Sequence, residues 1–336
     1  MQERLVSILT PCYNTAHLVW RLLDSVLNQT YPYIEMFIID DGSSDNTREL
    51  YERYSEKFHA KGYVLNYIYQ ENQGQSAAIN NGLKLINGEF LVWPDSDDFY
   101  ATDNAIEKMV FALASASYEY AMVRTLERVL DESTLEELCV SGLDAEAYEG
   151  KDLFEDCLFA RNGFYFVPGA YMVRVEALKC LTDMEIYTHK DAGQNWQIFL
   201  PVLYSYKCIT IKEILYNVLA REDSHSRGGY RGYNNELKRI RIYEDTILNT
   251  LDRLHTMSAP ERDSYKMLIK IKYLELRLNI AYSYRKRFDF AKDYRDLTEV
   301  LNSKITSNLR IKKIAVTAHM ESVLDFLINL KNKIIV

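Results

Sequence analysis

The stretch Glu89-Phe-Leu-Val-Trp-Pro-Asp-Ser-Asp-Asp-Phe-Tyr100 decides how this chain folds. Residues 90–93 are apolar or aromatic and predict a short buried strand. The carboxylates of Asp95, Asp97 and Asp98 follow at once, where a strand ordinarily ends in uncharged turn residues. Because side chains alternate along an extended segment, Asp95 and Asp97 can point the same way and offer oxygens to one Mg²⁺ or Mn²⁺. The stretch therefore predicts a metal site at a strand end; a solvated turn or a helix cap is the alternative.

A metal held in this way predicts a phosphate-containing ligand. A cation with so few protein oxygens keeps open coordination positions, and these suit a diphosphate. The strand-end loops contain neither Gly-x-Gly-x-x-Gly nor Gly-x-x-x-x-Gly-Lys-Ser/Thr, so neither a dinucleotide fingerprint nor a P-loop is present there. We therefore expect these acidic loops to bind phosphate through the cation.

The composition is that of a globular protein. With 336 residues, 48% of them hydrophobic, the chain can form one large domain or two ordinary ones. Its five cysteines are odd in number, scattered and without Cys-x-x-Cys spacing, so neither a disulfide framework nor a zinc site is predicted. We recognise no signal peptide and no run of about 18 apolar residues. These features predict a cytoplasmic protein, either soluble or peripheral at the inner face of the cell membrane.

Charge is distributed unevenly along the chain. The net charge is −8, yet residues 231–336 carry an excess of Lys and Arg, so the acidic excess lies entirely in residues 1–230. A nucleic-acid partner would need a basic surface beside the chemistry, because phosphates must be neutralised there. The sequence therefore argues against nucleic acid as a substrate.

Residues 6–94 repeat one pattern, a short apolar strand, a polar loop and an amphipathic helix. Strands are expected at residues 6–9, 34–39, 64–69 and 89–94, and helices at residues 17–29, 46–58 and 77–86. This alternation predicts an α/β fold, Rossmann-like, with a mostly parallel central sheet and helices on both faces. Ligands of such sheets bind beyond the carboxyl ends of the strands, so polar clusters at those ends should converge. The clusters surround Tyr13, Asp41, Asn72 and Asp97.

Four motifs occur in a fixed order in the first 98 residues. They are Thr-Pro-Cys-Tyr-Asn from Thr10, Ile-Asp-Asp-Gly-Ser-Ser-Asp-Asn-Thr from Ile39, Asn-Gln-Gly-Gln-Ser-Ala-Ala-Ile-Asn-Asn-Gly-Leu from Asn72, and Asp-Ser-Asp-Asp from Asp95. Together they resemble the family 2 glycosyltransferases with the GT-A fold, inverting enzymes of the bacterial surface-glycan type. The resemblance covers roughly residues 3–228. It implies transfer of a sugar from a nucleotide-diphosphate donor, with a UDP-sugar expected.

The resemblance assigns the donor site. It implies that Tyr13 stacks on the uracil and that Asp41 accepts the uracil N–H, and both roles suit these side chains. The alternatives are that Tyr13 packs under its loop and that Asp41 caps the following helix. By the same resemblance, further donor contacts are expected from Pro11, Asn72, Gly74, Asp95 and Ser96.

The resemblance also assigns the metal, Mn²⁺ or Mg²⁺. It implies that Asp97 is a direct ligand and that Asp95 reaches the metal through water or contacts the donor ribose, while Asp98 orients the loop. Such a cation neutralises the diphosphate and stabilises the charge that develops as the sugar leaves. Family members often carry Arg where Ile79 stands, so one phosphate partner is missing here.

The chain departs from the family pattern at the catalytic base. Family members commonly carry Glu-Asp before a helix in this region, whereas aligning residues 195–200 with that helix puts Asn195 at the Asp position. Because an amide is no base, we expect Asp191, about one helical turn earlier, to take the proton of the acceptor hydroxyl. The alternatives for this role are Asp41, Asp98 and Asp183.

Two further segments resemble parts of the family site. Residues 162–173 are rich in aromatic side chains, resemble the acceptor-side strand and could stack on sugar rings; ordinary core packing is the alternative. His225 and Arg227 lie where the family has a polar loop, and they could meet the metal or the diphosphate when that loop closes. A solvated loop is the alternative for this pair.

From residue 234 onward, apolar residues recur at the spacing of an amphipathic helix. We therefore expect a catalytic domain at residues 1–228 and a helical appendage at residues 229–336. Basic clusters at residues 285–287, 310–313 and 331–333 suit an anionic membrane surface, where a lipid-linked acceptor could wait. A helical bundle that is merely solvated, or that pairs two subunits, is the alternative.

The function that these observations favour is metal-dependent transfer of a sugar, with inversion, to a hydroxyl of a saccharide or lipid-linked glycan acceptor. A nucleotidyltransferase is disfavoured because residues 10–14 offer no basic, Gly-rich triphosphate loop. A catalytically silent protein that binds a sugar nucleotide or glycan is the second hypothesis, suggested by Asn195. A helical scaffold of a glycan-assembly complex is the third, and it depends on residues 231–336 alone.

Overall fold

The computed structural model describes residues 4–142, 153–181, 184–221, 231–301, 307–318, 321 and 324. The chain divides into two compact units. The first comprises Met1–Glu222 and Thr246–Ser258, and the second comprises Asp223–Asp245 and Ala259–Val336. One stretch of the helical region therefore belongs to the first unit.

The first unit is built on one mixed sheet, which has nine strands within the described residues. The strand order is β3-β2-β1-β4-β8-β6-β9-β5, and β7 pairs with β6. The strands are β1 (Val6–Cys12), β2 (Ile34–Asp40), β3 (Val64–Tyr69), β4 (Phe90–Val92), β5 (Phe99–Tyr100), β6 (Tyr120–Asp131), β7 (Glu137–Ser141), β8 (Tyr171–Arg174) and β9 (Lys207–Ala220).

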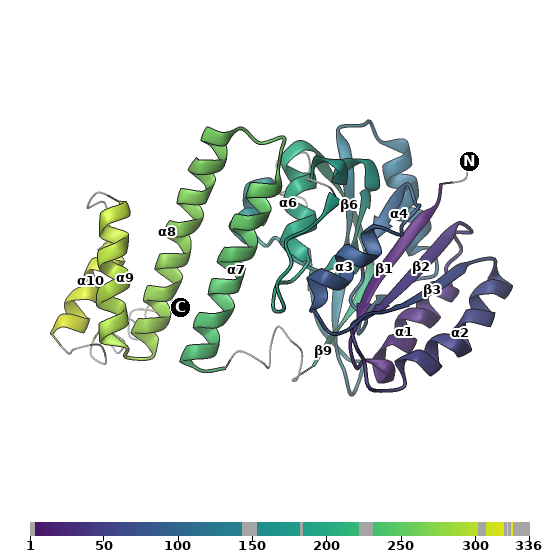
Figure 1. Ribbon diagram of the computed structural model, residues 1–336, viewed down its shortest axis with the longest axis horizontal. Coiled ribbons are helices and arrows are strands. Elements are labelled where there is room, and N and C mark those ends of the chain that lie inside the picture. Colours follow the sequence, from purple (N-terminus) through teal and green to yellow (C-terminus); the bar gives the residue numbers. More distant parts are fainter. Residues whose placement is uncertain are drawn as a thin grey trace. The chain divides into compact units, whose positions relative to one another are not determined.

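The amino-terminal half of the sheet, β1 to β4, is parallel. Its connecting helices are α1 (Ala16–Leu27), α2 (Thr47–Lys61) and α3 (Gln75–Leu83). Because crossovers between parallel strands are right-handed, α1 and α2 cover one face, and α3, which returns across the sheet, covers the other (Figure 1). Cys12 pairs with Asp40, and Asp40 pairs with Tyr69. The first three strands therefore end at one edge, which is where the polar loops begin.

The other half of the sheet is mixed. β8 runs antiparallel between β4 and β6, and β9 then pairs in parallel with β6. The α/β fold class is confirmed, but β5, β7 and β8 join by antiparallel pairing, so the parallel arrangement is limited to part of the sheet. The helices here are α4 (Ala105–Ser115), α5 (Phe154–Leu158) and α6 (Asn195–Ser205). The sequence patterns predict none of the elements between residues 105 and 141.

The carboxyl-terminal region is helical, as predicted. Its described helices are α7 (Tyr233–Arg253), α8 (Ala259–Ser283), α9 (Arg287–Val300) and α10 (Ser307–Thr317). Pro260 lies in the first turn of α8, where its missing N–H leaves no hydrogen bond unmade. None of the helices in the described part of the chain is long and apolar enough to cross a membrane.

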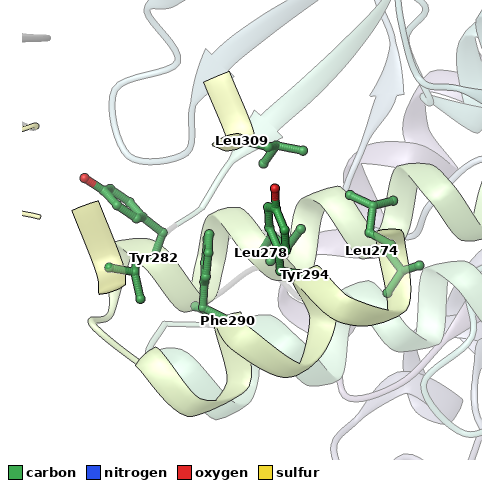
Figure 2. Packing of buried hydrophobic residues seen from close by; sticks show 9 residues of the cluster. Leu274, Leu278, Tyr282, Phe290, Tyr294 and Leu309 are labelled. Atoms are coloured by element: carbon green, nitrogen blue, oxygen red, sulfur yellow. The ribbon is translucent and has the colours of Figure 1, made fainter. Parts of the chain in front are cut away.

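The second unit has its own apolar core (Figure 2). Leu274, Leu278 and Tyr282 of α8 meet the rings of Phe290 and Tyr294 of α9. The ring centroids of Phe290 and Tyr294 are 6.1 Å apart, and those of Phe290 and Tyr282 are 6.3 Å apart. Phe290 is therefore the centre of the packing between the two helices.

Replacing Phe290 by alanine should destabilise the second unit by about 3–5 kcal/mol, because a buried aromatic ring leaves a cavity. Phe290 is 1% exposed, whereas Phe288 on the same helix is 83% exposed. Phe288→Ala is therefore a matched control and should change the free energy of unfolding by less than about 0.5 kcal/mol. Urea unfolding followed by far-ultraviolet circular dichroism measures both. Equal midpoints for the two variants would contradict the core described here.

Candidate functional site

The loops that follow β1 and β2 are joined to each other. The backbone N–H of Asn14 donates to Ser43 Oγ at 2.8 Å, and Asn14 Oδ1 accepts the backbone N–H of Ser44 at 2.8 Å. Asn14 has a φ of 53°, a left-handed conformation that asparagine tolerates. Beside it, Tyr13 is 52% exposed. Its ring is not packed under the loop, so an aromatic face is open to a ligand.

Asp41 joins the end of β2 to the loop that follows β3. Its buried carboxylate accepts hydrogen bonds from the side-chain amide of Gln70 at 2.7 Å, from Gln73 N at 2.9 Å and from Gly74 N at 2.8 Å. A carboxylate has about four acceptor positions, so one remains for a ligand N–H. The first turn of α2 is instead held by Asp45, which accepts the Thr47 N–H at 3.2 Å. The helix-cap alternative for Asp41 is therefore not what the structure shows.

Two glycines allow the loops to approach closely. A Cβ on Gly42 would lie 2.9 Å from Asn72 N, and a Cβ on Gly74 would lie 2.5 Å from Lys190 O. Both glycines have positive φ, +84° and +94°. Gly74 therefore brings the segment that carries Asp191 against the loop that Asp41 holds.

The substitution Gly74→Ala should be costly because its Cβ would collide with the backbone of Lys190. Gly62 at the end of α2 also has a positive φ, +88°, but nothing lies within 4 Å of its added Cβ. Gly62→Ala should therefore cost only the conformational penalty of about 1 kcal/mol. Gly74→Ala should cost on the order of 2–4 kcal/mol, because overpacking adds to that penalty. Thermal or urea unfolding tests this, and equal losses in the two variants would show that no close approach exists.

Helix α3 positions the Asp191 segment by side-chain hydrogen bonds to its backbone. The Asn80 amide donates to Ile186 O and accepts the Ile186 N–H, both at 2.9 Å. The Ser76 hydroxyl donates to His189 O at 3.1 Å and accepts the His189 N–H at 3.2 Å. These pairs span more than 100 positions of sequence. They place Asp191 beside the strand-end loops, although the sequence around Asp191 lacks the Glu-Asp motif of the family.

Asp95 is held by two amides. Gln75 Nε2 and Gln194 Nε2 both donate to Asp95 Oδ1 at 3.0 Å. Burial, followed by the negative charge of Asp97, raises the pKa of Asp95 to about 7, and the two amide donors oppose this shift. Gln75 and Gln194 are residues of the candidate site that the sequence analysis missed.

The remaining acidic residues of this loop face β9. Asp98 Oδ1 accepts the Leu219 N–H at 2.9 Å, and burial followed by the charges of its neighbouring aspartates raises its pKa well above the ordinary value. Asp97 Oδ2 forms an ion pair with Arg221 Nη2 at 3.1 Å. Ser96 Oγ accepts a hydrogen bond at 3.0 Å from the hydroxyl of Thr15 in the first loop. The acidic loop is thus linked both to the first strand-end loop and to the end of β9.

Asp95 and Asp97 suit a hard divalent cation. Their carboxylate oxygens are the ligands that Mg²⁺ and Mn²⁺ prefer, and their mutual repulsion is what a cation would relieve. The described part of the chain gathers no three His, Cys, Asp or Glu side chains into a closed metal cage. A cation here would therefore need further oxygens, and a diphosphate can supply them.

The stability of the metal-free protein should depend on Asp95. A carboxyl whose pKa is raised in the folded chain binds its proton more tightly there, so the free energy of unfolding falls as the pH rises from about 4 to about 7. With EDTA present, Asp95→Asn should therefore stabilise the protein at pH 8 by about 1–3 kcal/mol and have little effect at pH 5. Melting temperatures at both pH values test this. The same change in melting temperature at both pH values would contradict this prediction.

Asn195, at the family's base position, is tied into the structure. Its Nδ2 donates to Phe166 O at 3.1 Å. The carboxylate nearest to Asn195 in sequence is that of Asp191, which is half-buried in the turn before α6. Asp183, His225 and Arg227 lie outside the described residues.

The aromatic segment at residues 162–173 packs mainly into the core of the first unit. Phe164, Tyr165 and Tyr171 are buried, and Tyr171 is 4.5 Å from Phe199 of α6 between ring centroids. For these three rings the hypothesis of stacking on an acceptor sugar is therefore wrong, because protein covers them; Phe166 is half-buried, and for this ring the hypothesis stays a prediction. Pro11 is likewise buried within β1, opposite Ile39.

Comparison with known proteins agrees with this arrangement. The family model for glycosyl transferase family 2 matches residues 7–182, just over half of the chain. The Bacillus subtilis protein TuaG, whose name places it in teichuronic acid biosynthesis, is 36% identical over 109 residues, 32% of this chain and 42% of TuaG. Eight such relatives, TuaG among them, are matched over 14 to 44% of their own length.

Solved structures share the fold. S. aureus TarS 1-349 in complex with UDP-GlcNAc superposes with a TM-score of 0.63 at 15% identity and covers 96% of this chain and 91% of that one. The mannosyltransferase PcManGT from Pyrobaculum calidifontis, solved with GDP-Man and Mn²⁺, gives a TM-score of 0.54 at 16% identity, covering 97% and 88%. The GT-A sheet, the strand-end loops and the family model together show that this chain belongs to glycosyl transferase family 2.

Proposed function

We propose that this chain transfers a sugar from a nucleotide-diphosphate donor, a UDP-sugar, to a hydroxyl of a saccharide or lipid-linked glycan acceptor. The transfer depends on a metal and inverts the anomeric carbon. The observation that carries the proposal is the linkage of the strand-end loops by Asp41, Asn14 and Thr15, which gathers the acidic loop and an exposed aromatic ring at one edge of the sheet.

The donor is bound by the loops at the ends of β1, β2 and β3. Tyr13 provides the exposed face on which a uracil stacks, and Asp41 has one acceptor position left for its imide N–H. Asn72, Gly74 and Ser96 line the same edge. The UDP-GlcNAc complex of TarS and the GDP-Man complex of PcManGT support a sugar nucleotide as the ligand of this fold.

Asp97 and Asp95 would hold the cation, Mn²⁺ or Mg²⁺, and the diphosphate would supply further oxygens. When bound, such a cation neutralises the diphosphate as the bond to the sugar breaks. The Mn²⁺ of the PcManGT complex supports this part of the proposal. Gln75 and Gln194 fix Asp95 Oδ1 by two hydrogen bonds and so leave its second oxygen for the ligand side.

Asp191 acts as the general base. It takes the proton of the acceptor hydroxyl while the acceptor oxygen forms a bond to the anomeric carbon, and the bond from that carbon to the diphosphate oxygen breaks. A single displacement of this kind inverts the anomeric configuration. Helix α3 holds the Asp191 segment rigidly through Asn80 and Ser76, which supplies the orientation that such a step needs.

The setting is polysaccharide or glycoconjugate biosynthesis, supported by the process in the name of TuaG. We place the protein in the cytoplasm or at the inner face of the membrane, with residues 231–336 contacting the membrane surface or a second subunit. Arg285, Lys286 and Arg287 beside the exposed Phe288 support a surface contact. Nucleic acid is not a partner in this proposal.

The proposal is tested with a panel of UDP-sugars and GDP-mannose, with saccharide and lipid-linked acceptors, in Mn²⁺, Mg²⁺ or EDTA. Release of UDP from one donor, only with metal, is expected. Nuclear magnetic resonance of the product then gives the anomeric configuration. Tight binding of a sugar nucleotide without turnover of any donor would instead support the silent binding protein that Asn195 suggests.

A further inference from the structure

We propose that the guanidinium of Arg221 pairs with Asp97 while no metal is bound. When a divalent cation binds Asp97, the guanidinium moves to the donor diphosphate. Arg221 thereby makes the binding of metal and nucleotide mutually dependent. This inference deepens the proposed function and rests on it.

The first observation is the burial of the ion pair. Arg221 Nη2 lies 3.1 Å from Asp97 Oδ2, and the two side chains are only 11% and 20% exposed. At the other end of β9, the pair between Lys207 and Glu119 is 44% and 53% exposed. An enclosed pair is screened less by water than an exposed one, so the attraction of Arg221 for Asp97 is substantial.

The second observation is that the backbone fixes the two partners. Asp98 Oδ1 accepts the Leu219 N–H at 2.9 Å, and Arg221 follows Leu219 by two residues just beyond β9. The acidic loop and the strand end are therefore joined beside the ion pair. Arg221 meets Asp97 because the strand pairing places it there.

The third observation is the charge of the loop. Asp95, Asp97 and Asp98 stand within four consecutive residues, so three carboxyl groups share one short loop. Arg221 supplies a positive charge to this cluster. A divalent cation that binds Asp97 needs the same carboxylate, and it repels the guanidinium at close range. The cation and Arg221 are therefore competitors while no other anion is present.

A diphosphate changes this relationship. The planar fork of an arginine matches the oxygens of a phosphate, and it can bind them with two parallel hydrogen bonds. With the nucleotide bound, Arg221 and the metal no longer share one carboxylate, because the diphosphate offers both of them anionic oxygens. Each ligand then strengthens the binding of the other by the same factor, as linkage requires.

The experiment measures the dissociation constant of Mn²⁺ by electron paramagnetic resonance of the free ion, with and without saturating UDP. In the wild type we expect weak Mn²⁺ binding that UDP strengthens. In Arg221→Ala, Mn²⁺ should bind more tightly without UDP, and the strengthening by UDP should shrink by about tenfold, within the usual range of coupling between sites. Arg221→Gln keeps much of the side-chain volume, removes only the charge and should give the same two signs.

The matched control is Lys207→Ala, which removes a cation from the opposite end of the same strand and should change neither constant. Unchanged Mn²⁺ affinity without UDP in both Arg221 variants, or unchanged coupling, would overturn this inference alone. If wild-type protein shows no Mn²⁺-dependent binding of UDP, the proposed function fails and this inference fails with it.

Discussion

Replacing Asp97 by asparagine should reduce turnover of the sugar-nucleotide donor on the order of 10³-fold, the scale of losing one stabiliser of developing charge. The carboxylate of Asp97 pairs with a side chain, that of Arg221, which can give way to a cation. Neighbouring Asp98 is instead bound to the backbone of β9. Steady-state release of UDP at saturating Mn²⁺ measures the effect.

The matched control is Asp98→Asn in the same loop. The amide oxygen can still accept the Leu219 N–H that joins the loop to β9. This variant should retain turnover to within about tenfold, since its hydrogen bond is preserved. Equal losses from both substitutions would mean that Asp97 has no special role. Function that survives Asp97→Asn unchanged would favour the scaffold hypothesis.

Replacing Asp191 by asparagine should lower kcat by about 10²–10⁴-fold, the usual contribution of a general base, and leave the dissociation constant of UDP unchanged. The amide keeps the size of the side chain, and the backbone contacts through Ser76 and Asn80 are untouched. Titration calorimetry with UDP and Mn²⁺, beside steady-state kinetics, separates binding from chemistry. Weaker UDP binding as the main effect would contradict the role of Asp191 as the base.

Asn195 provides the second half of this test. An aspartate there would lose the donor that binds Phe166 O, so Asn195→Asp should destabilise the protein by about 1–3 kcal/mol and bring no gain in turnover. Introduced into the Asp191→Asn enzyme, it should not restore activity. Recovery of turnover in this double variant would place the base at position 195 and overturn the assignment to Asp191.

The strand-end site of the first unit could be predicted from sequence because its geometry follows from the fold class. The strands at residues 6–12, 34–40 and 64–69 are parallel neighbours, so their carboxyl ends meet at one edge. The helical carboxyl-terminal region was likewise readable from its period. The strands and the helices are both predicted from the local spacing of apolar residues, which can be read directly from a sequence.

Contacts across long stretches of sequence could not be predicted. Gln194 meets Asp95 across 99 positions, and Leu219 meets Asp98 across 121. Both contacts depend on where β9 and α6 lie in the mixed half of the sheet. β8 is buried along its whole length, and a short apolar run does not indicate whether a strand pairs in parallel or antiparallel.

The aromatic segment shows a different limit. Phe164 and Tyr171 are as suitable for stacking on a sugar as for filling a core, and only burial separates the two. The sequence assigns no role to Arg221, because an arginine after a strand has no pattern of its own. Its significance comes from the carboxylate it meets.

Hydrogen–deuterium exchange with and without UDP and Mn²⁺ tests directly whether the strand-end loops form one nucleotide-sugar site. We expect simultaneous protection of residues 10–15, 40–46, 70–75 and 94–98, lost when EDTA replaces Mn²⁺, with no change in α8 and α9. Protection confined to one loop, protection that does not need the metal, or no protection in these loops would contradict the site proposed for this chain.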